Sequence, residues 1–81
     1  MENFDKFSEE LSLILLYIHS FKEKGFETSA PRSWKGYDFS TLDRLSQQGY
    51  VIDKHSNKSL AITDEGIEKA KELLKKYGIE N

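Results

Sequence analysis

Four polar side chains are predicted to lie on one side of a helical segment over residues 38–48. They are Thr41, Arg44, Gln47 and Gln48. Arginine and glutamine can each donate or accept paired hydrogen bonds on base edges in the DNA major groove. The pattern therefore predicts a helix that reads base pairs. The alternative is an ordinary solvated helix face, and Asp43 favours it because a carboxylate repels phosphate.

A second group of polar residues falls in a predicted turn between two short strands. They are Lys54, His55, Asn57 and Lys58. Lysines on such a turn can contact phosphates, and the turn itself can enter a groove. Lysines also protect exposed strands from pairing with other chains. Both interpretations stay open.

The third group is Arg32, Trp34 and Lys35, just before residues 38–48. The two basic residues are predicted to hold phosphates beside that helix. Trp34 could stack on a base, but the only tryptophan among 81 residues is expected in the core. Tyr37 and Phe39 are expected there as well.

Other site chemistry finds little support in the sequence. His19 and Glu23 are four residues apart, but two ligands do not make a metal site. The chain has no cysteine, no glycine-rich phosphate loop and no Ser/His/Asp arrangement. We expect no enzymatic activity, no cofactor, no metal and no small-molecule substrate.

The first element that must position these groups is a helix predicted over residues 5–22. Its core side follows a period near 3.6 residues. That side consists of Phe7, Leu11, Ile14, Leu15, Ile18 and Phe21. Leu13, Leu16 and Tyr17 widen the apolar stripe, so they are predicted to form a homodimer contact. The alternative is that they complete the core.

The remaining elements follow from turn residues and caps. Residues 26–37 contain Pro31 and Gly36, which leaves at most one helical turn near residues 33–35. The helix over 38–48 should end at Gly49. Strands over 50–54 and 59–62 form a hairpin, and Thr63 caps a last helix that ends at Gly78.

Composition sets the class of protein. Residues 1–81 are the length of one domain, with a net charge of -2. Residues 28–60 hold five basic and three acidic side chains, so the middle is mildly positive. The apolar run at 13–18 is too short for a membrane span, and the N-terminus is acidic. We expect a cytoplasmic protein without a membrane segment.

Residues 42–52 and 60–66 resemble the second half of bacterial winged-helix regulators. Those regulators share the pattern L-x-x-L-x-x-x-G, a hydrophobic residue and Ile, and later L-T-x-x-G, which this chain approaches with L-A-I-T-D-E-G. The resemblance implies an α+β, mainly helical fold: helix, short irregular turn, helix, two-stranded hairpin wing and C-terminal helix. It also implies a double-stranded DNA-binding protein, such as a transcriptional regulator. The alternative is an interaction or dimerisation module that does not bind DNA.

A narrower resemblance rests on residues 31–39, P-R-S-W-K-G-Y-D-F. This segment is similar to one found in a family of small, uncharacterised prokaryotic winged-helix proteins. That resemblance supports the same fold and implies nothing about mechanism.

Overall fold

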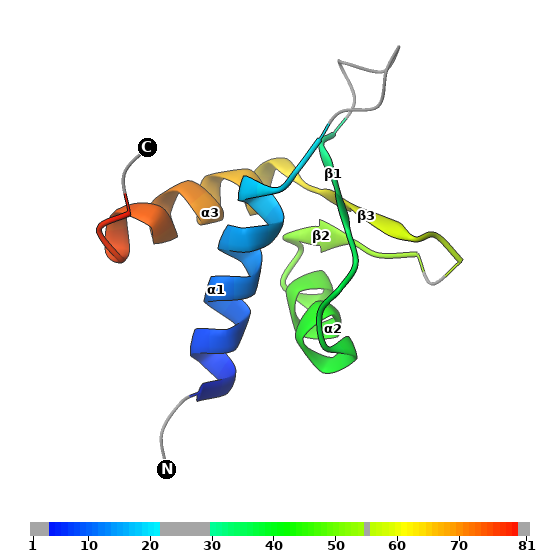
Figure 1. Ribbon diagram of the computed structural model, residues 1–81, viewed down its shortest axis with the longest axis horizontal. Helices are drawn as coiled ribbons and strands as arrows, with labels where there is room; N and C mark the ends of the chain where they lie inside the picture. Colours follow the sequence, from blue (N-terminus) through cyan, green and yellow to red (C-terminus); the bar gives the residue numbers. More distant parts are fainter. Residues whose placement is uncertain (1–3, 22–29, 55, 80–81) are drawn as a thin grey trace.

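The computed structural model describes residues 4–21, 30–54 and 56–79. They form an α+β fold of three helices and a small three-stranded antiparallel sheet (Figure 1). The elements in order are α1 (Phe4–Ile18), β1 (Arg32–Trp34), α2 (Phe39–Gln47), β2 (Val51–Ile52), β3 (Ser59–Ile62) and α3 (Asp64–Lys76). This order is consistent with a winged-helix-like layout. Among the helices described, none combines the length and the apolar character needed to cross a membrane.

The sheet has one strand more than the predicted hairpin. β1 pairs with β3, so the strand order is β1-β3-β2, and the predicted helical turn near residues 33–35 is absent. Pro31 disfavours helix before it, and its carbonyl accepts a hydrogen bond from Ile62 at 2.9 Å. Phe21 was expected on a helix. Instead it exchanges backbone hydrogen bonds with Arg32, at 2.7 and 2.8 Å.

The core side of α1 differs from the predicted one, although Ile14 is buried as predicted. Leu13 and Leu16, predicted as dimer contacts, are buried in the core with Ile14, and Tyr17 packs partly buried against them. The predicted core residues Phe7, Leu11, Leu15 and Ile18 are exposed instead. Helix α1 is apolar on nearly every side, so the 3.6-residue period does not say which side turns inward.

Helices α2 and α3 end as predicted. Gly49 and Gly78 have φ angles of 83° and 67°, which favour glycine after a helix. The Thr63 hydroxyl accepts from the Gly66 amide at 2.9 Å and donates to the Gly49 carbonyl at 2.6 Å. One side chain therefore caps α3 and ties it to the end of α2. A Cβ on Gly66 would lie 2.0 Å from the Tyr50 carbonyl oxygen, so this contact requires glycine.

Two aromatic residues predicted for the core are at the surface. Trp34 is 63% exposed and Phe39 is 69% exposed, whereas Tyr37 is partly buried against the core. Side chains alternate along a strand, so the buried Ser33 leaves Trp34 pointing outward. Its ring packs on Phe21, with centroids 5.1 Å apart.

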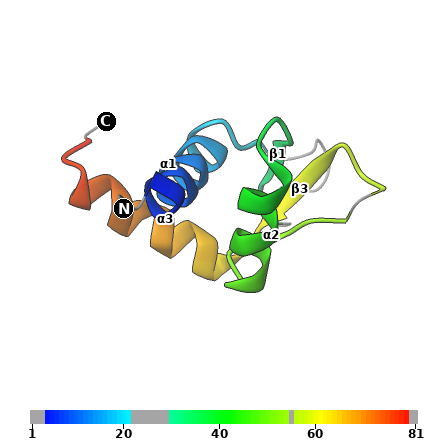
Figure 2. The same ribbon diagram turned by 90° about the horizontal axis from the view of Figure 1, so that it is seen from below.

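Figure 2 shows α1 nearly end-on, with α3 below it and α2 and the sheet to its right. The contacts of α1 are with α2, α3 and β1. These neighbours cover one side of the helix and leave the opposite side open.

Candidate functional site

The predicted base-reading side of α2 is only partly available. Thr41 is 2% exposed and belongs to the buried side of the helix, with Leu42 and Leu45. It lies four residues before Leu45, which puts both on one face. Gln47 is exposed as predicted.

Arg44 and Gln48 are both held by one carboxylate of α1. The Arg44 Nε donates to Glu9 Oε2 at 2.6 Å, and the Gln48 Nε2 donates to Glu9 Oε1 at 2.8 Å. The Glu9 side chain is 18% exposed, so this ion pair is partly screened from water. Its carboxylate neutralises the guanidinium, and the two hydrogen bonds occupy the Nε donor of Arg44 and the side-chain amide of Gln48.

The basic residues near the sheet also have structural partners. The Lys35 ammonium lies 2.5 Å from Asp53 Oδ1 and donates to the Lys54 carbonyl at 2.7 Å. Arg32 donates to the hydroxyl and the carbonyl of Ser59, at 2.9 and 3.0 Å. Both side chains thus fasten β1 to the β2–β3 hairpin.

The hairpin turn keeps its predicted exposure. Lys54, Asn57 and Lys58 are exposed, and within the described residues neither lysine has an ion-pair partner. His55 lies outside the described residues. Lys54 and Lys58 are thus exposed basic side chains of the predicted DNA surface, and no acid among the described residues neutralises them.

A buried carboxylate that sequence reasoning missed joins α1 to α3. Glu10 accepts from the Lys76 ammonium at 3.1 and 3.2 Å and from the Tyr77 hydroxyl at 2.5 Å. The Tyr77 hydrogen bond lowers the pKa of Glu10, outweighing the opposite effect of burial, and Lys76 lowers it further. The same hydrogen bond raises the pKa of Tyr77. The signal in the sequence was two adjacent acids inside an apolar helix.

The cleft beside these acids is small. It lies between α1, α2 and α3, is lined by Lys6, Glu9, Glu10 and Tyr50, and has a volume of about 120 Å³. Sites for drug-sized ligands are typically about 300 Å³ or larger. The described residues hold no group of three or more metal-ligating side chains. His19 is exposed, and Glu23 lies outside the described residues.

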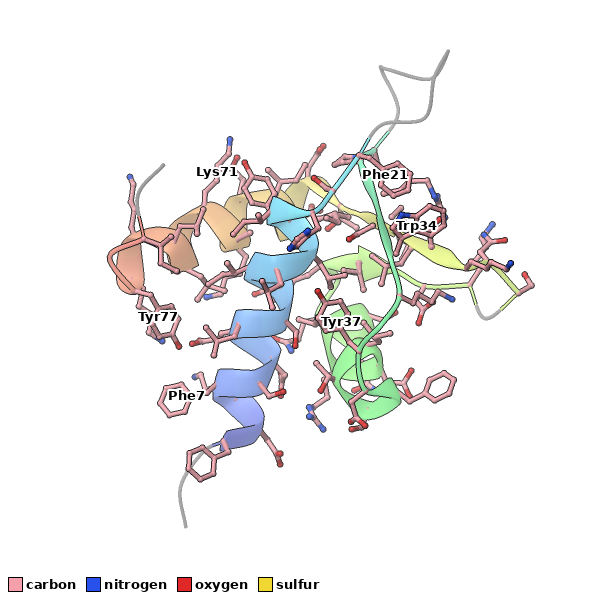
Figure 3. All side chains as sticks on the ribbon, viewed as in Figure 1. Phe7, Phe21, Trp34, Tyr37, Lys71 and Tyr77 are labelled. Atoms are coloured by element: carbon pink, nitrogen blue, oxygen red, sulfur yellow. The ribbon has the colours of Figure 1, made fainter. Side chains whose placement is uncertain are left out.

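The side of α1 that faces away from its neighbours is apolar. Its exposed residues are Phe4, Phe7, Leu11, Leu15 and Ile18, called here the outward face of α1. Between 43% and 66% of each residue's surface is exposed. Figure 3 shows the labelled Phe7 on the side of α1 away from α2. Apolar patches of this kind are often functional.

One protein-family profile matches nearly all of the residues that carry these features. The profile of a domain of unknown function, DUF6429, matches residues 5–80. The chain belongs to the DUF6429 family. The match runs from the start of α1 to the end of α3, so Glu9, Glu10 and most of the outward face of α1 lie within the DUF6429 domain.

One curated relative of this DUF6429 chain is the uncharacterized protein y4hR of Sinorhizobium fredii. The two are 42% identical over 45 residues, which are 54% of this chain and 61% of that protein. The chain thus matches about three fifths of the relative's length. No solved structure is significantly similar to the chain.

Proposed function

We propose that this DUF6429 chain is a protein-association module on a winged-helix scaffold, which binds its partner through the outward face of α1. The scaffold assignment rests on the order of the elements: helix, strand, helix, hairpin and helix. The observation that carries the function is the set of five exposed apolar side chains on one side of one helix.

The size of this apolar surface supports the proposal. A whole aromatic side chain has an area of about 150–250 Å², so five half-exposed large residues leave on the order of 400 Å² in water. Burial at about 25 cal/mol per Å² favours association by roughly 10 kcal/mol before the entropic costs. A standard interface covers about 800 Å² on each partner. The outward face of α1 would therefore form the apolar centre of such an interface.

The low free positive charge on α2 also supports protein association over DNA binding. Arg44 and Gln48 are occupied by Glu9, and Thr41 is buried. The exposed acids on this side are Asp38 and Asp43. Affinity for DNA comes mostly from cations that neutralise phosphates, so α2 lacks the charge that DNA docking requires.

A photo-crosslinking experiment in host cells tests the proposal. Benzoylphenylalanine would replace Phe7 on α1 or, as the matched control, Phe39 on α2, since both are exposed phenylalanines. We expect protein adducts from position 7 and few from position 39. The proposal is overturned if position 7 gives no adduct, or if the two positions give the same adducts in the same yield.

DNA binding is a second candidate, favoured by one observation: Lys54 and Lys58 are exposed at the hairpin turn and have no ion-pair partner within the described residues. Two phosphate contacts predict a slope of about -2 for log K against log salt. An amide titration with duplex DNA at low salt should then shift residues of this turn. A Lys54→Gln, Lys58→Gln double variant should lose those shifts, whereas Lys75→Gln on α3 should keep them.

A further inference from the structure

The outward face of α1 has a spacing that is symmetric about its middle residue. Its members fall at positions 4, 7, 11, 15 and 18, so the intervals from either end to Leu11 are three and then four residues. In an α-helix these positions lie within an arc of roughly 80°. The stripe therefore has the same spacing of apolar side chains whichever end is met first.

We propose that the occupant of this face is a second copy of the chain, with the two α1 helices antiparallel and Leu11 beside the two-fold axis. This inference rests on the proposed function of the face and names its partner. Phe4 then meets the partner's Ile18, and Phe7 meets the partner's Leu15. Leu11 meets the partner's Leu11. A two-fold interface needs a surface that complements itself, and a symmetric stripe has this property.

The helix dipoles favour the antiparallel orientation. Each helix carries about half a positive charge at its N-terminus and half a negative charge at its C-terminus. Antiparallel neighbours place opposite ends together, and parallel neighbours place like ends together. The stripe itself has no charged side chain. A different protein that carries a complementary charge is therefore not needed to cover it.

The chain contains no cysteine, so single-cysteine variants can test the arrangement directly. Light scattering should first give about twice the chain mass of 9.4 kDa. Leu11→Cys should then form a disulfide-linked dimer on mild oxidation. Phe4→Cys alone should not, because antiparallel pairing separates the two copies of position 4 by about 21 Å along the axis. A mixture of Phe4→Cys and Ile18→Cys should cross-link.

Charge exchange provides an independent check in the same protein. Phe7→Glu and Leu15→Lys should each be monomeric, because each sets a charge against an apolar side chain. Mixed together they should form a heterodimer in which the new glutamate faces the new lysine. A parallel pair would place position 7 beside position 7 and could not restore the dimer. Circular dichroism would confirm that both variants remain folded.

The outcomes separate this inference from the function on which it rests. Cross-linking of Phe4→Cys to itself would overturn the antiparallel arrangement. A monomeric wild-type protein that still gives adducts with another protein from position 7 would overturn the second copy but keep the association function. A monomer that gives no adduct from position 7 would overturn both.

Discussion

The outward faces of α1 and α2 are both open to solvent, but they leave different groups without partners. On α2 the arginine and one glutamine are already bonded to Glu9, and the exposed remainder is polar apart from Phe39 at the start of the helix. On α1 five large apolar residues face water, and none of the elements in the described residues covers them. Water satisfies exposed polar groups well and apolar groups poorly. The difference identifies α1 as the face that gains most from a partner.

One residue links the two faces. Glu9 sits on the flank of α1 that turns toward α2, where it binds Arg44 and Gln48. Its neighbour Glu10 turns toward α3 and binds Lys76 and Tyr77. These two acids tie α1 to α2 and α3 in the rotation that buries Leu13, Ile14 and Leu16. The apolar stripe on the opposite side is consequently held outward.

The largest expected effect comes from truncating one leucine on each side of α1. Leu13→Ala should lower the free energy of unfolding by about 2–5 kcal/mol, because it leaves a cavity in a packed core. Leu11→Ala should change it by no more than about 0.5 kcal/mol in the monomer. Urea unfolding of both variants at low protein concentration measures the difference. Equal losses of unfolding free energy in the two variants would mean that Leu11 and Leu13 are equally buried, so α1 would have a different rotation.

The elements that could be predicted from sequence are those whose ends carry local signals. Gly49 and Gly78 stop α2 and α3, and Thr63 starts α3, through bonds that span only a few residues. The exposure of Gln47 and of the turn lysines also followed from local pattern. Such signals are readable because both partners lie within one or two turns of chain.

The features that were missed depend on contacts between distant residues. Strand β1 exists because Arg32–Trp34 pairs with Ser59–Ala61, and no periodicity within three residues reveals a distant partner. Glu9 and Arg44 are 35 residues apart. The inward side of α1 is set by packing and bonds to residues far along the chain, so an apolar helix read alone gave the wrong side for most of the predicted core residues, with Ile14 as the exception. The predicted dimer contacts on Leu13 and Leu16 failed for this reason.

A second test of the difference between the faces of α1 and α2 is to remove the Glu9 charge that pairs with Arg44 on α2. Glu9→Gln should remove the negative charge paired with Arg44 and raise the net charge by one, at a cost to stability of about 1 kcal/mol. If Arg44 is otherwise able to contact phosphate, the salt dependence of DNA binding should steepen by about one. Binding would be measured by fluorescence anisotropy at several salt concentrations.

The control for that experiment is Glu65→Gln on α3, which changes the net charge equally at an exposed position. Glu9→Gln should exceed this control if α2 is masked by Glu9. Equal binding by the two variants would show that only total charge matters. In that case the contrast between the two faces would not depend on the Glu9 contact.

The smallest expected effect concerns the bond that holds α1 to α3. The pKa of Glu10 is below its ordinary value of 4.5, chiefly because the Tyr77 hydroxyl donates to its carboxylate. A carboxyl whose pKa falls on folding stabilises the protein above the unfolded pKa, and this contribution is lost as pH falls through the folded value. The pKa of Tyr77 is above 10.0 for the reciprocal reason. Its contribution is present below pH 10 and is lost as pH rises through the folded value.

Tyr77→Phe should therefore reduce stability most between these two limits and flatten the pH dependence at both ends. Tyr50→Phe is the matched control, because the Tyr50 hydroxyl makes no bond to a carboxylate within the described residues. Thermal unfolding of both variants and of the wild type from acidic to alkaline pH measures the profiles. If Tyr77→Phe matches the wild-type profile, the Glu10 bond does not hold α1 in place. The orientation of the outward face would then depend on Glu9 and on apolar packing alone.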